Sequence, residues 1–356
     1  LYGSINERIK LIMAYTTINK SSDYFNTKLY TGNGGTQSIT GVGFQPDFTW
    51  IKTRSGTYKH LLVDAVRGVT KHISTVNNAA EIANSDNVTA FASDGFNLAS
   101  DGNVNANSGT YASWNWRAAT GAGSANTDGS INADASVNTT SGFSIVAYGG
   151  NGTSGATVGH GLGVIPKMII VKRRNAVGGW IAYNETLGNT KIMELEEMAG
   201  SQTSSAAWNN TSPTSSVFTL GDYTSTNQSG GTYVAYCFAE KQGYSKFGSY
   251  IGNGNADGSF IYTGFKPAYV MLKRTDTTAH WFVLDNKRNE FNVVDKLLYV
   301  NETYAEGTND FLDFTSNGFK LRTTNTGFNA SGGTYIYMAF AEAPLVGTNN
   351  VPATAR

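Results

Sequence analysis

Two pairs of oppositely charged residues recur along the chain with the same spacing. Asp64 precedes Arg67 by three positions, and Asp285 precedes Arg288 by three. A carboxylate beside a guanidinium could belong to a sugar-binding or catalytic site, because glycosidases place two carboxylates across the scissile bond. The alternative is an ion pair that stabilises a turn. We favour the ion pair, because the equivalent position in the middle of the chain holds Asn184 in place of the acid.

Other groups with catalytic or metal-binding chemistry form no recognisable set. The glutamates 194, 196 and 197 are closely spaced, which is more typical of a solvated face than of an active site. The histidines show neither an H-E-x-x-H pattern nor recurrence at equivalent positions, and no G-x-S-x-G element is present; they are His60, His72, His160 and His280. We therefore expect no enzyme activity, no metal and no cofactor.

One stretch, residues 101–105, has the residue types of a calcium-binding loop. Asp101, Asn103 and Asn105 alternate as oxygen ligands do in calcium loops, but the glycine and the terminal glutamate of the helical calcium loop are absent. Asp and Asn are also ordinary turn-forming residues. The turn is therefore the favoured interpretation.

One tryptophan differs from the other five. Trp208 and Asn209 stand in a polar stretch with no equivalent elsewhere in the chain, whereas the remaining tryptophans fall on apolar faces of expected strands, where core packing is favoured. Trp208 is therefore the aromatic residue expected to meet a ligand or a neighbouring subunit.

Composition limits the classes of function. The chain has 356 residues with 40% apolar and 15% charged side chains, and 26 basic residues balance 26 acidic ones. This balance gives no basic field for nucleic acid. Cys237 is the single cysteine, so no intrachain disulfide can form. No apolar run is long enough to span a membrane and no secretory signal is visible. We expect a soluble, non-exported protein without nucleic-acid binding or membrane insertion.

Three segments share the same landmarks in the same order: residues 25–117, 143–240 and 247–342. Each opens with a tyrosine two residues before Gly-Asn-Gly, contains a proline followed six residues later by a lysine, and closes with Gly-Thr-Tyr. The prolines and lysines are Pro46, Pro166, Pro267, Lys52, Lys172 and Lys273. Self-similarity at a fixed period indicates a repeated structural unit, here a module of about 100 residues that makes its own core.

Residue alternation predicts the faces of the strands. The strand after each proline is apolar on both sides, which is typical of an interior strand. The closing strand of each module has large apolar groups on one face and smaller groups on the other, such as Ser113, Ala235 and Ala339. With abundant glycine and clean alternation elsewhere, the sequence predicts an all-β fold of three tandem β-sandwich-like modules with short helical inserts. The expected helices are 77–83, 192–199 and 294–304.

The segments between and beyond the modules are expected to connect or attach them. They are an N-terminal extension (1–24), a Gly/Ser/Asn-rich linker (118–142) and a C-terminal tail (343–356). The long linker predicts that the first module is looser than the closely joined second and third. Because Met13-Ala14-Tyr15 resembles a translation start, residues 1–12 are expected to be an upstream extension or part of a longer chain.

Three long strings carry a resemblance to a known family: MAYTTINKSSDYFNTKLYTGNG from Met13, the stretch from Ser141 to Lys172, and SNGFKLRTTNTGFNASGGTYIYMAFAE from Ser316. They resemble an uncharacterised family of structural, tail-fibre-like proteins of marine tailed bacteriophages. The resemblance implies a virion surface protein assembled in the host cytoplasm, with no catalytic residues. It also implies a homotrimer, in which the small-residue face of each closing strand would meet another copy.

Three functions remain open at this stage. The leading hypothesis is a tail fibre or receptor-binding adhesin that contacts other virion proteins and binds a glycan or protein on the host surface. The alternatives are a head-decorating or filament-forming structural protein and a polysaccharide depolymerase. Ligand-binding candidates are Trp208, Asn209 and the two Asp/Arg pairs.

Overall fold

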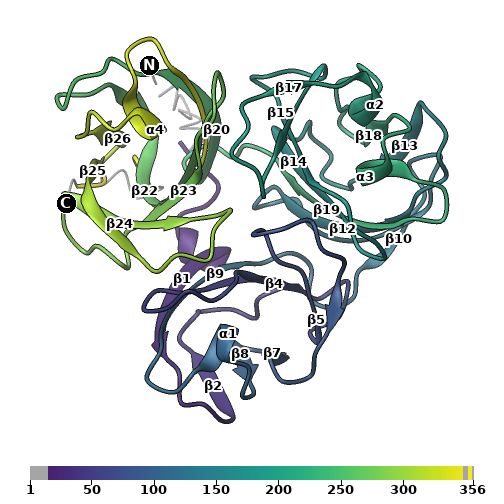
Figure 1. Ribbon diagram of the computed structural model, residues 1–356, viewed down its shortest axis with the longest axis horizontal. Helices are drawn as coiled ribbons and strands as arrows, with labels where there is room; N and C mark the ends of the chain where they lie inside the picture. Colours follow the sequence, from purple (N-terminus) through teal and green to yellow (C-terminus); the bar gives the residue numbers. More distant parts are fainter. Residues whose placement is uncertain (1–14, 348–351, 355–356) are drawn as a thin grey trace, which may run out of the picture.

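The computed structural model describes residues 15–347 and 352–354, and it is built almost entirely of β-strands. Figure 1 shows three lobes arranged around a common centre, each made of one sequence segment. The all-β fold is therefore confirmed. Within the described residues, no helix combines the length and the apolar character needed to cross a membrane.

The first module contains a four-stranded antiparallel sheet and a smaller second sheet. The strand order of the first is β1 (Phe25–Thr31), β9 (Thr110–Trp116), β3 (Phe48–Thr53) and β4 (Leu61–Asp64). The second contains β2 (Gln37–Thr40), β8 (Gly95–Leu98) and β7 (Val88–Ala92), and a further pair is β5 (Lys71–His72) with β6 (Ile82–Ala83). A single-turn helix, α1 (Gly102–Asn105), precedes the closing strand β9.

The second module repeats this strand order. Its sheet contains β12 (Phe143–Gly149), β19 (Thr232–Phe238), β14 (Met168–Arg173), β15 (Trp180–Asn184), β16 (Lys191–Glu194) and β17 (Gln202–Thr203). A small sheet of β13 (Ala156–Gly159) and β18 (Val217–Leu220) covers it, with helices α2 (Ser205–Trp208) and α3 (Thr224–Asn227).

The third module continues the pattern in one eight-stranded sheet. Its strands, in spatial order, are β20 (Ser245–Ile251), β27 (Thr334–Pro344), β22 (Phe265–Arg274), β23 (Trp281–Asp285), β24 (Val294–Tyr299), β25 (Gly307–Thr315), β26 (Gly318–Leu321) and β21 (Phe260–Tyr262). Helix α4 (Thr326–Asn329) precedes the closing strand, as α1 and α3 do.

Residues 118–142 are not a free linker. They contain β10 (Ser124–Asn126) and β11 (Ala133–Asn138), and β11 pairs along its length with β12 of the second module. The Gly and Asn turns in this segment connect strands instead of loosening the chain. The expectation of a looser first module assumed that residues 118–142 are a free linker, and that assumption is wrong.

The expected helices lie in the wrong places. Ile82–Ala83, Lys191–Glu194 and Val294–Tyr299 form strands. The four α-helices are single turns of four residues elsewhere, too short for a helical period to appear in the sequence.

The recurring Gly-Asn-Gly turns are held by the single-turn helices. In each module the last helical residue is a buried asparagine whose Oδ1 accepts the backbone N–H of the turn asparagine; the pairs are Asn105 with Asn33, Asn227 with Asn151 and Asn329 with Asn253, at 2.8–3.0 Å. A Cβ on Gly32 would lie 2.3 Å from a carbonyl oxygen, so this position requires glycine. The turn motif is therefore structural.

The main sheet of each module, formed by the closing strand and the strands beside it, is buried on both faces. One face packs in the core of its own module, against the small sheet in the first two modules and against β25, β26 and β21 of the same sheet in the third. The other face packs in a central core shared by all three modules. In that core Phe48 stacks on Tyr236 at 4.4 Å, and Phe238 lies 6.1 Å from Phe340. The strands are apolar on both sides because both sides are buried. Each module does have a core of its own, as expected, but it also contributes to the central core that all three modules share.

The modules form a closed ring through one repeated hydrogen bond of 2.8 Å at each junction. It joins Glu81 N to Arg174 O, Ser201 N to Thr275 O, and Glu306 N to Arg54 O. The last bond returns from the third module to the first. All three junctions therefore share this backbone hydrogen bond, and one chain supplies a pseudo-threefold assembly.

The small-residue faces of the closing strands are also buried inside the chain: Ser113, Ala235 and Ala339 are fully covered. These faces need no other copy to cover them, so the reason given for a homotrimer is removed. Association of copies stays a prediction.

Residues 15–24 pack against the third module, and this contact differs from the free arm expected for an attachment segment. Residues 1–14, which include most of the expected N-terminal extension, lie outside the described residues. Tyr15 donates its hydroxyl to Gly264 O at 2.7 Å, Thr16 donates to Gln242 O at 2.7 Å, and Ile18 lies in the central core. The segment 15–24, including the short 3-10 turn Ser21–Asp23, therefore packs on the third module. Strand β27 runs into the expected tail and ends at Pro344.

Candidate functional site

The two Asp/Arg pairs are buried ion pairs at module junctions. Arg67 Nε lies 2.5 Å from Asp64 Oδ2, Arg288 Nε lies 2.6 Å from Asp285 Oδ2, and all four side chains are fully buried. The interpretation as ion pairs is confirmed. Because these groups do not reach solvent, they cannot contact a sugar in this structure. The acid of each pair also accepts a hydrogen bond from an aromatic residue of the next module: Asp64 from the Tyr236 hydroxyl, and Asp285 from the Trp114 indole.

Trp208 is not an exposed aromatic. It is 1% exposed in α2 and lies 5.8 Å from the ring of Tyr183 in the core of the second module. Asn209 follows in the left-handed conformation at φ 50° and ends the helix, and its Oδ1 accepts the Ser154 hydroxyl at 3.0 Å. The polar neighbours of Trp208 face solvent while its ring faces inward. The expectation of exposure is wrong.

The calcium candidate is a helix cap. Asp101 Oδ1 accepts the backbone N–H of Asn103 at 2.8 Å, and Oδ2 accepts the Asn84 amide at 2.7 Å. Asn105 is buried and holds the Gly-Asn-Gly turn. Within the described ranges, no three His, Cys, Asp or Glu residues are grouped as metal ligands would be.

The three lysines after the prolines have a role that sequence reasoning missed. Each is fully buried and donates its Nζ to a carbonyl of the preceding module in the ring: Lys52 to Thr303 O at 3.1 Å, Lys172 to Asn78 O at 3.1 Å and Lys273 to Met198 O at 2.7 Å. Burial lowers the pKa of Lys52 to about 7, and the carbonyl acceptors favour its charged form. The sequence signal for this role was a lysine that recurs at the same position of an otherwise apolar strand in all three modules.

Surface hollows occur at equivalent places in the first and third modules. In the third module a hollow of about 400 Å³ lies between the start of β23, the end of β24, β25 and the start of α4. In the first, a hollow of about 270 Å³ lies between the start of β4, the segment after β5 and the start of α1. Strand register makes these sites equivalent, because Leu62 pairs with Ile73 as Val283 pairs with Leu298.

The third-module hollow is lined by aromatic and uncharged polar groups. Tyr299 lies 5.0 Å from the ring of His280 and 5.5 Å from that of Phe282. Phe311 forms another part of the wall, and Asn325 stands at the helix start. Volumes of about 300–1,000 Å³ are usual for small-molecule sites. The exposed lining of this hollow is more polar than apolar.

The first-module hollow carries charge. Lys59, His72 and Asp101 all line it. His72 Nδ1 lies 2.7 Å from the Asn87 amide nitrogen, and burial lowers the pKa of this histidine. The two hollows therefore occupy one position in the fold and differ in chemistry.

The second module has carboxylates at the same position. Gly179 replaces His280, and a Cβ built on it would lie 3.0 Å from Glu196 Oε1 and 3.3 Å from Glu194 Oε1. Glu196 accepts the N–H of Trp180 at 3.0 Å, just as Asn301 accepts that of Trp281 at 3.2 Å. Burial raises the pKa of Glu196 to about 7. Glu196 is therefore a backbone cap, and the expectation of a solvated glutamate face is wrong for this residue.

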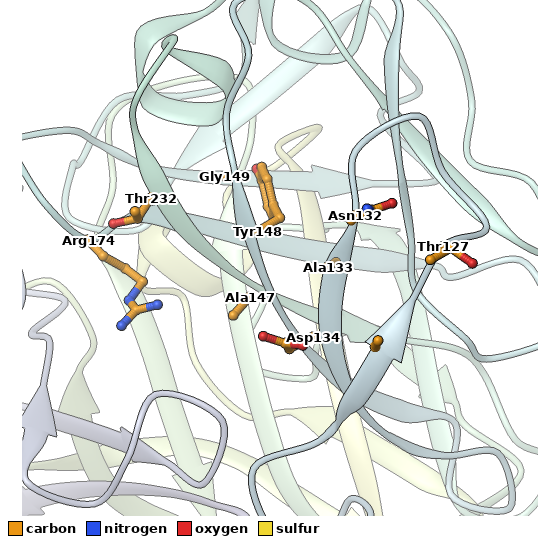
Figure 2. Close-up of a pocket in the computed structure, with 10 residues that line it drawn as sticks. Thr127, Asn132, Ala133, Asp134, Ala147, Tyr148, Gly149, Arg174 and Thr232 are labelled. Atoms are coloured by element: carbon orange, nitrogen blue, oxygen red, sulfur yellow. The ribbon is translucent and has the colours of Figure 1, made fainter.

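Another hollow, of about 350 Å³, lies where β10 and β11 join the second module. Figure 2 shows Arg174 and Asp134 on either side of Ala147. Arg174 already pairs with Glu81 at 2.9 Å, and Asp134 is exposed. This hollow is more open than that of the third module and therefore has less wall to enclose a ligand.

Together these features define an all-β protein of three ring-closed modules, whose repeated residues build the scaffold and whose hollows differ from module to module. The chain belongs to the family described as Domain of unknown function (DUF7483), whose model matches residues 20–344. No curated protein and no solved structure matches the chain significantly.

Proposed function

We propose that this chain is a bacteriophage virion surface protein, a tail fibre component or receptor-binding adhesin, that binds a host-surface glycan or protein without catalysis. The virion part of the proposal rests on the resemblance of three long sequence strings to tail-fibre-like phage proteins. The binding part rests on one structural observation. A single position in the fold is hollow in two modules and is lined differently in each, while the scaffold around it repeats.

Catalysis has less support than binding. The carboxylates at that position are Asp101 in the first module and Glu194 and Glu196 in the second. Asp101 caps α1, and Glu196 accepts the backbone N–H of Trp180. A glycosidase needs two free carboxylates across a groove. The Asp/Arg pairs are buried and fully occupied by their partners.

Localisation on the particle tests the virion role. Antibody against the purified chain, bound to particles and imaged by electron microscopy, is expected to label the tail. Labelling of the capsid would support the head-decorating alternative, and absence of the chain from particles would overturn the virion role.

Adsorption tests the binding role. The purified chain, added in excess to host cells, is expected to slow adsorption of the phage that encodes it, while heat-unfolded chain has no effect. Unchanged adsorption would contradict the adhesin role. Release of reducing ends from host polysaccharide by the purified chain would instead support a depolymerase.

A further inference from the structure

The hollow of the third module is the uncharged member of an equivalent set. The first-module hollow has Lys59 and Asp101 in its lining, and the second module has Glu194 and Glu196 at the same position. The third-module lining contains neither a carboxylate nor an ammonium group among the described residues. Two groups of opposite charge stand just outside this lining: Glu302 Oε1 lies 3.7 Å from His280 Nδ1, and Lys296 Nζ lies 3.4 Å from Thr308 Oγ1. The hollow therefore has no excess of either charge to attract a charged ligand.

Polar groups with free hydrogen-bonding capacity stand beside the aromatic wall. Asn325 uses its Oδ1 to cap α4, accepting the Gly327 N–H at 2.8 Å, and its amide nitrogen has no partner within the described part of the chain. The Asn301 side chain accepts the Trp281 N–H through Oδ1 and holds the His280 ring, whose Nδ1 lies 3.1 Å from the Asn301 amide nitrogen and 3.3 Å from its Oδ1. The other ring nitrogen, Nε2, donates or accepts a hydrogen bond according to which nitrogen carries the proton.

The wall itself supplies apolar surface. Phe282 and Phe311 both stack on Phe328, at 4.4 and 4.7 Å, and this stacking fixes their positions. Tyr299 is partly exposed, and the half-exposed Tyr304 lies 5.6 Å from it. An apolar ring face beside amide and imidazole groups matches a ligand with one C–H face and a rim of hydroxyls.

We infer that the third-module hollow is a binding site for a neutral pyranose, with the sugar ring against Tyr299 and its hydroxyls toward Asn325 and His280. This inference rests on the proposed binding function and names its ligand class and site. The other modules supply the test variants, because each shows what a folded module holds at the same position.

The experiment is ligand-observed NMR and titration of the full chain with methyl glucoside, methyl galactoside, methyl mannoside and N-acetylglucosamine. Glucuronate and N-acetylneuraminate serve as charged comparators. At least one neutral sugar is expected to bind with a Kd on the order of 1 mM, and the charged sugars are expected to bind at least about tenfold more weakly. Binding of no neutral sugar, or equal binding of charged ones, would overturn the inference.

Two variants locate the site. Tyr299→Ser introduces the residue type that the first module has at this position, Ser74. Asn325→Tyr introduces the residue type that precedes the equivalent helix of the second module, Tyr223, and the larger side chain is expected to reduce the hollow. Each is expected to weaken sugar binding about tenfold or more, whereas Tyr299→Phe keeps the ring and stays within about threefold. The reciprocal control Tyr223→Asn should leave binding unchanged. Unaltered binding in both Tyr299→Ser and Asn325→Tyr would place the sugar elsewhere and overturn the inference.

Failure here is separable from failure of the proposed function. If the chain blocks adsorption but Tyr299→Ser blocks it equally well and no neutral sugar binds, the adhesin role stands and the pyranose site is wrong. If sugars bind in the third module but the chain neither labels the tail nor blocks adsorption, the site stands and the adhesin role is wrong. Circular dichroism and the unfolding midpoint establish that each variant is folded.

Discussion

The indole N–H of Trp114, in the first module, donates to Asp285 Oδ2 of the third module at 3.0 Å, and thereby links these two modules across their junction. At the next junction the Tyr236 hydroxyl donates to Asp64 Oδ2 at 2.7 Å. At the remaining junction, Asn184 and Leu187 replace the Asp/Arg pair, and Met338 replaces the donor. The junction that lacks the Asp/Arg pair therefore also lacks the aromatic side chain that donates a hydrogen bond to the aspartate.

This match predicts how the Asp64–Arg67 junction responds to substitution. Arg67→Leu leaves the buried carboxylate of Asp64 without its cation, and removal of one partner of a buried pair typically costs about 3–5 kcal/mol. Arg67 also pairs with Glu81 at 3.0 Å, and Glu81 keeps its second partner, Arg174, when Arg67 is replaced. The triple variant Asp64→Asn, Arg67→Leu, Tyr236→Met introduces the Asn, Leu and Met that the remaining junction holds at these positions. It is expected to recover most of that loss in the free energy of unfolding, measured by urea denaturation. A triple variant less stable than Arg67→Leu would contradict this account.

Much of this scaffold could be predicted from the sequence, because its signals are local or repeated. Alternation around Phe48 and Trp114 indicated strands buried on both faces, and the Gly-Thr-Tyr and Gly-Asn-Gly motifs marked the module ends. Ring closure could not be predicted. The bond between Trp114 and Asp285 joins residues 171 positions apart, and no periodicity encodes such a contact.

The hollows were missed for a related reason. Tyr299 ends β24 and Asn325 precedes α4, and only the tertiary fold brings them to one hollow. Trp208 was predicted to be exposed because its sequence neighbours are polar, but it lies in a single helical turn that directs its ring inward. Comparison of Ser74, Glu194 and Tyr299 across the aligned modules was the one signal that could have found the site.

The buried lysines are expected to stabilise the ring. Lys52→Met keeps the length and apolar character of the side chain but leaves the Thr53 and Thr303 carbonyl oxygens without this donor. Unsatisfied buried acceptors cost about 1–3 kcal/mol each. The unfolding free energy should therefore fall by about 2–4 kcal/mol near pH 10.5, where burial of the Lys52 charge, which lowers its pKa to about 7, no longer opposes this contribution. Lys59→Met, at an exposed position, is the control and should change it by less than about 0.5 kcal/mol. Equal stability of Lys52→Met and the wild type would show that the carbonyl contacts contribute nothing.

Glu196 predicts a pH dependence of stability. Burial raises its pKa from 4.5 to about 7, so the folded state prefers the protonated acid. Its contribution is therefore most favourable below about pH 4.5 and is lost as pH rises through about 7. Glu196→Gln keeps an acceptor for the Trp180 N–H without the charge, as Asn301 does in the third module. It should be more stable than the wild type at pH 8 by about 1–2 kcal/mol, after allowance for partial exposure, and equal to it near pH 4.

Unfolding midpoints of the two proteins between pH 4 and pH 8 measure this difference. Glu197→Gln, at an exposed neighbouring position, should follow the wild-type curve throughout. Parallel curves for Glu196→Gln and the wild type would mean that Glu196 stays ionised without cost in the folded protein.

The shared central core predicts that the modules depend on one another for folding. The second module contributes Ile145, Ile170, Trp180 and Phe238 to that core, and an isolated fragment 118–240 would expose them to water. Exposure of apolar area costs about 25 cal/mol per Å², so we expect the fragment to be unfolded or aggregated, and the full chain to unfold in one cooperative transition. NMR amide dispersion of the fragment and calorimetry of the full chain measure both outcomes. A well-dispersed, monomeric fragment would show that each module's own core is sufficient, and the ring would then be an assembly of independent domains.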